Sequence, residues 1–208
     1  MKKVLLIALA LICCFAAEAQ LRTIKPSEIY KIPNISRATY SSNGPDNPNN
    51  LLFELFYSDA TKWAGYVNNI VASSTLKSQG SKNYRATNLR DWNHETAWVE
   101  GVKGHGIGQW IEYQGIDDEE EPIWAICILN GYVKSDKAWR ENGRVKRLKV
   151  YCNGKPKCIF ELQNSRSLQS FKVEGLFGSR VKTLRFEILD VYPGTKFQDT
   201  VISEILLL

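Results

Sequence analysis

Oxygen-bearing side chains recur at close spacing in one segment of the sequence, residues 88–98. The amide, carboxylate and hydroxyl oxygens belong to Asn88, Asp91, Asn93 and Thr96. A loop of this composition can wrap a hard cation such as Ca²⁺, which takes about six to eight oxygen ligands, many of them backbone carbonyls. A plain polar turn is the alternative interpretation, and the loop taken alone does not decide between the two.

Motifs that would indicate an enzyme are missing from the sequence. It contains no GxSxG, HExxH, P-loop or CxxC pattern, and its two histidines, His94 and His105, lie in no metal-ligand spacing. Asp91, Glu95 and Glu100 could supply a general acid and base, but the sequence does not show that they converge. We therefore expect a protein without a catalytic centre, and a hydrolase using these three carboxylates is the weakest alternative.

The elements that must position these residues are predicted to be short β-strands between turns. The strongest strand patterns cover residues 109–113, 123–129, 144–151, 157–162, 171–173, 183–189 and 200–208. Many short strands at near-regular spacing are typical of an all-β sandwich or barrel. The strands 109–113 and 123–129 are predicted to form a hairpin, with a solvated acidic tip at 117–122.

The N-terminal residues indicate export. A basic pair, Lys2 and Lys3, precedes an apolar stretch at 4–15 and a small-x-small cleavage site at 17–19. This pattern predicts a signal peptide at 1–19 and a mature protein that begins at Gln20, with a lipid anchor on an early cysteine as a minor alternative. We expect a periplasmic or secreted protein.

Composition and charge narrow the class further. The 208 residues are 44% hydrophobic and 24% charged, which describes an ordinary globular chain and excludes a disordered one. The formal net charge of +5 is spread along the chain, so no nucleic-acid partner is indicated. No later apolar run approaches the roughly 20 residues of a membrane helix. The sequence leaves the oligomeric state open.

Three cysteines follow the predicted cleavage site. Cys152 and Cys158 flank the turn sequence at 153–157, so we expect them on adjacent strands of one hairpin. A disulfide across this hairpin and two reduced thiols are both open interpretations. Cys127 lies in the apolar run at 123–129, which predicts a buried and unreactive thiol.

Seven short segments in the second two thirds of the chain match, in the same order, segments of a known domain family. They are ASSTL (72–76), NLRD (88–91), TAWVEG (96–101), GIGQWI (106–111), LNGYVK (129–134), NGRVKRL (142–148) and VYPGTKFQDTVISEI (191–205). Through them the chain resembles the discoidin-like, galactose-binding-like domains, and most closely the glycan-binding domains attached to some secreted NAD glycohydrolases. It departs from that pattern at Trp92, where the family usually has a glycine after the aspartate, and this changes the backbone freedom of the loop.

The resemblance implies a jelly-roll β-sandwich of two antiparallel sheets over residues 66–208, preceded by an extension at 20–65. It also implies a structural calcium ion that ties the loop at 88–96 to the last strand. The residues that this family pattern would assign to the ion are Asn88, Asp91, Asn93, Thr96, Ser203 and Glu204. Such an ion would add its binding free energy to folding.

Ligand binding on this fold would use loops at one end of the sandwich. A sugar needs an aromatic face and a few polar groups, and predicted loops offer Trp92, His105, Trp139, Arg140, Tyr192 and Lys196. The segment 134–143 is the best single candidate, because it is long, polar and carries one tryptophan. Trp98, Trp110 and Trp124 lie in predicted strands and are expected in the core.

These observations favour an exported, non-catalytic glycan-binding module. A cell-envelope adaptor that binds another protein remains the main alternative, because the same loops would serve either partner.

Overall fold

The computed structural model describes residues 21–31, 66–91, 93–117 and 122–208. The predicted signal peptide, most of the extension at 20–65, Trp92 and the acidic residues 118–121 lie outside the described residues. In the described part, no helix is long and apolar enough to cross a membrane.

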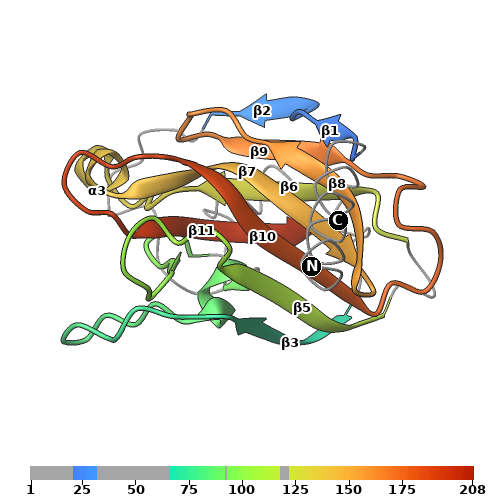
Figure 1. Cartoon of the computed structure of the whole chain (residues 1–208), viewed down its shortest axis with the longest axis horizontal. Coiled ribbons are helices and arrows are strands. Elements are labelled where there is room, and N and C mark those ends of the chain that lie inside the picture. The colour runs from blue at the N-terminus through green and yellow to red at the C-terminus, as the bar shows by residue number, and fades with distance from the viewer. Residues whose placement is uncertain (1–20, 32–65, 92, 118–121) are drawn as a thin grey trace, which may run out of the picture.

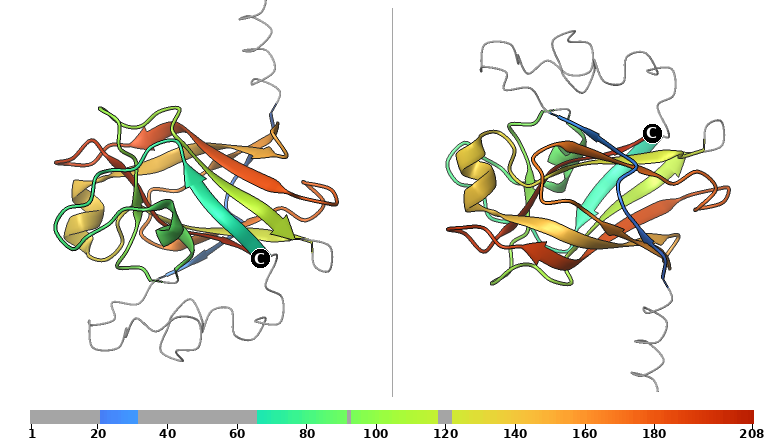
Figure 2. Two further views of the ribbon diagram at one scale, coloured as in Figure 1. Left: turned by 90° about the horizontal axis from the view of Figure 1, so that it is seen from below. Right: turned by 90° about the horizontal axis from the view of Figure 1, so that it is seen from above.

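Two layers of strands pack face to face, as expected for a β-sandwich (Figures 1 and 2). One layer contains, in order, β3 (Tyr66–Ala72), β5 (Trp110–Asp117), β10 (Thr183–Tyr192), β7 (Gly143–Cys152) and β8 (Lys155–Glu161). The other contains β2 (Glu28–Tyr30), β9 (Leu168–Lys172), β6 (Ala125–Asn130), β11 (Thr200–Leu207) and β4 (Trp98–Val99). The prediction of an all-β sandwich is confirmed.

The core lies between the layers, and it is built from the side chains that alternate strand residues point inward. In β10, Leu184, Phe186 and Ile188 are fully buried, whereas the residues between them are partly exposed. Phe160 of β8 stacks on Phe171 of β9 with ring centroids 4.3 Å apart, and this contact joins the two layers.

Strand β11 connects the layers. It pairs antiparallel with β6 and β4, and its first two residues pair in parallel with Gly143 and Arg144 of β7. A second parallel pair joins β1 (Thr23–Ile24) to β8. The sheet is therefore mixed, which corrects the expectation of purely antiparallel pairing. Because β11 is covered on both sides, all eight of its residues are buried.

The start of the extension adds strands to both layers. Strand β1 lies beside β8, and β2 pairs antiparallel with β9. Residues 21–31 of the extension are therefore part of the sandwich.

The predicted hairpin of 109–113 with 123–129 is wrong. Strand β5 pairs with β3 and β10, whereas β6 pairs with β9 and β11 in the other layer. The connection between them crosses from one layer to the other. Alternation shows that each segment is a strand, but it carries no information about which neighbour a strand pairs with.

The β7–β8 hairpin is confirmed. Asn153 and Gly154 form its turn with φ of 49° and 74°, as an Asn-Gly turn requires. The register places Cys158 opposite Val150, and Cys152 opposite Lys155, and all three described cysteines are free thiols. Burial raises the pKa of both Cys127 and Cys158 to about 12, so these thiols are protonated and unreactive at neutral pH.

Candidate functional site

The segment 134–143, expected to be a long loop, contains the short helix α3 (Asp136–Glu141). Ser135 begins the helix, because its hydroxyl accepts a hydrogen bond of 3.1 Å from the Ala138 amide. Asp136 in the first turn and Arg140 in the last complement the helix dipole. These local signals explain why this polar stretch is helical. The helix lies at one end of the sandwich, beside the loop that follows β10 (Figure 1).

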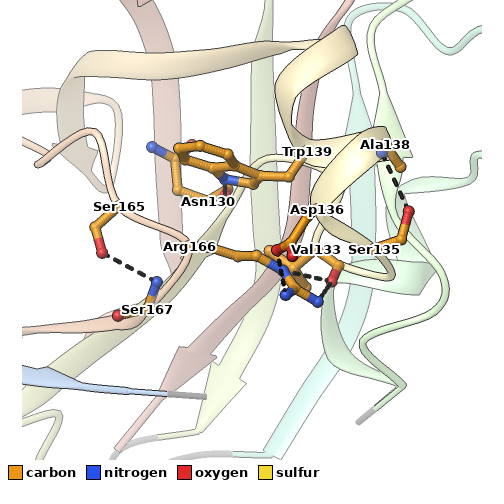
Figure 3. Close-up of polar contacts among 9 residues, drawn as sticks. All are labelled: Asn130, Val133, Ser135, Asp136, Ala138, Trp139, Ser165, Arg166 and Ser167. Atoms are coloured by element: carbon orange, nitrogen blue, oxygen red, sulfur yellow. Dashed lines mark hydrogen bonds and ion pairs between the residues drawn. The ribbon is translucent and has the colours of Figure 1, made fainter. Parts of the chain in front are cut away.

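Trp139 fixes α3 to the sandwich. Its indole N–H donates to the Asn130 carbonyl at 2.9 Å (Figure 3). The Arg144 guanidinium lies 4.5 Å from the ring centroid. A side chain on Gly131 would lie only 2.7 Å from the indole, so the ring approaches the backbone closely there. The predicted ligand aromatic is therefore a packing residue in this structure.

Arg166 holds the start of the same segment. Its Nε donates to the Val133 carbonyl at 2.9 Å, Nη2 donates to that oxygen as well, and Nη1 lies 2.8 Å from the Asp136 carboxylate (Figure 3). This forked contact fixes both ends of the turn that leads into α3. The backbone from Val133 to Asp136 is thereby set from a loop distant in sequence.

An open groove lies beside this helix and consists of two adjoining hollows of about 430 and 500 Å³. We call it the loop-end groove. Four residues line both hollows and form its shared wall: Lys82, Tyr132, Lys134 and Ser135. The first hollow also contains Tyr84, Lys137, Glu141, Phe197 and Asp199, and the second Asn83, Asn93, His94, Glu95 and Thr96. These volumes lie in the usual range of small-ligand sites.

Aromatic rings and charges meet in the loop-end groove. The Lys134 ammonium lies 4.4 Å from the centroid of the Tyr132 ring. Burial is the first cause that raises the pKa of both Tyr84 and Tyr132, so both phenols stay neutral and can donate hydrogen bonds. Lys137 and Glu141 form a loose ion pair at 4.0 Å. The groove therefore offers rings, hydroxyls and ammonium groups together.

A carboxylate corner lies behind the second hollow. The Asp91 carboxylate accepts hydrogen bonds from the Thr96 hydroxyl at 2.7 Å and from the Asn93 amide at 3.0 Å. The Asn93 carbonyl in turn accepts from the Thr96 amide at 2.9 Å. The side-chain amide of Asn88 donates to the Ala97 carbonyl at 2.9 Å. The loop expected to surround an ion is thus folded around its own aspartate.

Glu204 meets Asp91 from the last strand, as the resemblance implied. Its side chain is fully buried, and neither carboxylate oxygen accepts a well-formed hydrogen bond from a described residue. Burial, and after it the charge of the neighbouring Asp91, raise the pKa of Glu204 well above its usual range. Burial also raises the pKa of Asp91. Two facing carboxyl groups, of which Glu204 has both oxygens without a hydrogen-bond partner, are a donor set that a hard cation takes, so these residues fit Ca²⁺.

The corner and the groove share parts. Asn93 and Thr96 contact Asp91 and also line the second hollow. Ser203, next to Glu204 in β11, donates to the Gly131 carbonyl at 2.8 Å and accepts from the Val133 amide at 3.3 Å. The chain that carries Tyr132 is therefore held directly by the strand that carries Glu204.

The other predicted ligand residues lie outside the hollows. The His105 ring contacts the Gln198 carbonyl at 3.0 Å, and the Tyr192 hydroxyl donates to the Leu162 carbonyl at 3.0 Å. Arg140 and Lys196 are exposed and line neither hollow. Trp92 lies outside the described residues.

The aromatic residues of the loop-end groove were not predicted from the sequence. Tyr84 and Tyr132 were not proposed as ligand residues, although LNGYVK belongs to the segments that carried the resemblance. The segment 134–143 does line the groove, through residues other than Trp139 and Arg140. No pattern in the sequence indicates which face of this segment points into a hollow.

The tryptophans expected in the core differ in burial. Trp98 is fully buried and donates to the Ser74 carbonyl at 3.0 Å. Trp110 is partly buried beneath Arg185, whose guanidinium lies 4.2 Å from the ring centroid. Trp124 is 36% exposed, which corrects the expectation for that residue. Strand β6 begins at Ala125, two residues later than expected, so Trp124 precedes it.

The three candidate acid–base carboxylates have different surroundings. Asp91 faces Glu204, and Glu95 is exposed at the second hollow. Glu100 is fully buried and accepts hydrogen bonds from the backbone amides of Val102 and Thr200. Among the described residues, no three His, Cys, Asp or Glu side chains converge as a metal site would require. A calcium ion at the corner would therefore depend on carbonyl and hydroxyl oxygens as well.

Comparison with known proteins identifies the family. The model of the NAD glycohydrolase translocation F5/8 type C domain matches residues 61–208. The chain belongs to this family. The match begins close to the predicted domain start at residue 66 and covers the whole sandwich from β3 to β11. The resemblance identified from the seven segments is thereby confirmed.

Solved structures and curated proteins add little to this assignment. Two cryo-EM structures of the arabinofuranosyltransferase AftD from Mycobacteria, one of them of a mutant, are 20% and 18% identical, each with a TM-score of 0.45. Each match covers 68% of this chain but only 10% or 11% of the transferase chain. Likeness at this level carries no functional argument. No curated protein matches the chain.

Proposed function

We propose that this protein is an exported, non-catalytic carbohydrate-binding module whose ligand occupies the loop-end groove. The observation that carries this proposal is the groove itself, in which Tyr84 and Tyr132 lie among amide, hydroxyl and ammonium groups. The partly exposed Tyr132 ring can stack on the apolar face of a sugar, and the polar groups of the groove can bond its hydroxyls. Membership of the F5/8 type C domain family supports a binding role.

Export and the absence of catalysis have separate support. The basic, apolar and small-residue pattern at 1–19 supports export. The different surroundings of Asp91, Glu95 and Glu100 support a binding module over a hydrolase, because a glycosidase holds two carboxyl groups on either side of one bond.

The proposed module also binds a calcium ion at the carboxylate corner. Asp91 and Glu204 would hold the ion with their carboxylates, together with oxygens of Asn88, Asn93, Thr96 and Ser203. The ion would neutralise two facing acidic groups and fix the loop at 91–96 against β11. Its role would be structural, because the corner lies behind the groove.

A glycan array with the mature protein tests the function. We expect specific sugars to bind the wild type and Trp124→Ala, whose exposed ring lies outside the groove, and to lose affinity for Tyr132→Ala. Binding that survives Tyr132→Ala would place the ligand elsewhere. A silent array combined with capture of a defined envelope protein would favour the adaptor alternative.

A further inference from the structure

The shared wall of the loop-end groove carries positive charge and no negative charge. Lys82 and Lys134 line both hollows, together with the neutral Tyr132 and Ser135. The acidic residues of the groove each line one hollow: Glu141 and Asp199 the first, and Glu95 the second. The two ammonium groups are therefore concentrated where the hollows meet.

The acidic residues lie outside the shared wall. Glu141 lies within 4.0 Å of Lys137, which is in the same hollow. Asp199 lines only the first hollow, and Glu95 lines only the second. In the described part of the chain, neither Lys82 nor Lys134 has a carboxylate within 4.0 Å.

Lys134 is also positioned for a ligand. Its side chain is half-buried, and its ammonium lies against the Tyr132 ring at 4.4 Å. Holding a lysine over a ring reduces its freedom, so less conformational entropy is lost when a ligand binds. The Arg166 contacts to Val133 and Asp136, together with the Ser203 contacts, fix the backbone on both sides of this lysine (Figure 3).

We propose that the loop-end groove selects an acidic glycan, with a carboxylate or sulfate of one sugar placed between Lys82 and Lys134 and neutral sugars extending into the two hollows. The inference rests on the proposed glycan-binding function and names its ligand class. The partly exposed Tyr132 ring contacts a sugar ring, and the two lysines recognise the charge. Two adjoining hollows suit a chain of several sugars better than a single one.

A glycan array of matched pairs tests this, each pair differing in one acidic group: sialylated against unsialylated lactose, sulfated against unsulfated lactose, and a uronic acid oligosaccharide against its carboxyl-reduced form. We expect the acidic members to bind about tenfold more tightly, with a preference that shrinks at high salt. The sialyl and uronic pairs report recognition of a carboxylate, and the sulfated pair reports recognition of a sulfate.

Two lysine variants sharpen the test by titration calorimetry on the best pair. Lys82→Gln and Lys134→Gln should each weaken the acidic member by roughly threefold to fivefold and leave the neutral member unchanged. Lys137→Gln, in the same groove but paired with Glu141, is the matched control and should change little. Neutral members that bind as tightly as acidic ones would overturn the acidic selectivity and leave the glycan function standing. An array on which no glycan binds would overturn the proposed function itself.

Discussion

The substitution Glu204→Gln tests the carboxylate corner most directly. Glu204 is fully buried, faces Asp91, and receives no well-formed hydrogen bond from a described residue. Without an ion, a charged Glu204, or a proton shared with Asp91, destabilises the folded state. The neutral amide of the glutamine can donate a hydrogen bond to Asp91 and should remove that destabilisation. We therefore expect the variant to be about 1–2 kcal/mol more stable than the wild type in chelator.

Calcium should reverse this order. At a free ion concentration 100 times the dissociation constant, binding adds about 2.7 kcal/mol to the wild type. For a domain of this size that corresponds to a rise of roughly 5–11 °C in the melting temperature. The variant lacks one of the two charged ligands, so we expect it to gain little and to be the less stable protein in calcium.

Thermal melts of both proteins in calcium and in chelator are the measurement, with Glu161→Gln on the partly exposed surface of β8 as the matched control. If the wild type melts at the same temperature in calcium and in chelator, and the variant is more stable than the wild type in both, the corner binds no calcium and is a buried carboxyl pair. A variant that is less stable than the wild type in chelator would refute the account of the buried charge.

Three further predictions concern the frame of the site. Trp139→Ala should lower the free energy of unfolding in urea by about 3 kcal/mol, because it removes the anchor of α3, whereas the exposed Trp124→Ala should cost under about 1 kcal/mol. Gly106→Ala should cost about 1–3 kcal/mol in the same assay, because Gly106 has a φ of 65° and a Cβ there would lie 2.5 Å from the Glu100 side chain; an unchanged midpoint would contradict this. Burial raises the pKa of Glu100 above 4.5, so the folded protein keeps this proton to a higher pH than the unfolded chain does. The contribution of Glu100 to the free energy of unfolding should therefore decline as pH rises from about 4.5 through the folded pKa. Urea titrations across this range should show a stability that depends less on pH in Glu100→Gln than in the wild type.

Most of the strands and the family could be predicted from the sequence. Alternation located β7, β8, β10 and β11 to within a few residues, because burial on one face of a strand imposes a period of two. The Asn153-Gly154 turn determined the β7–β8 hairpin, because its backbone angles are a local property. The segments shared with the family indicated that Asp91 and Glu204 meet, although they lie far apart in the chain.

The pairing of the strands and the lining of the groove depend on contacts between distant parts of the chain. Strands β5 and β6 are adjacent in sequence and lie in different layers, because pairing depends on the whole sheet and not on either strand. Trp139 turns inward, where its indole N–H meets the Asn130 carbonyl and its ring meets the Arg144 guanidinium. The loops at 76–84 and 132–135 are far apart in sequence, and the sandwich brings them together in one hollow. A groove between loops is a property of their relative placement, and no local pattern of residues encodes that placement.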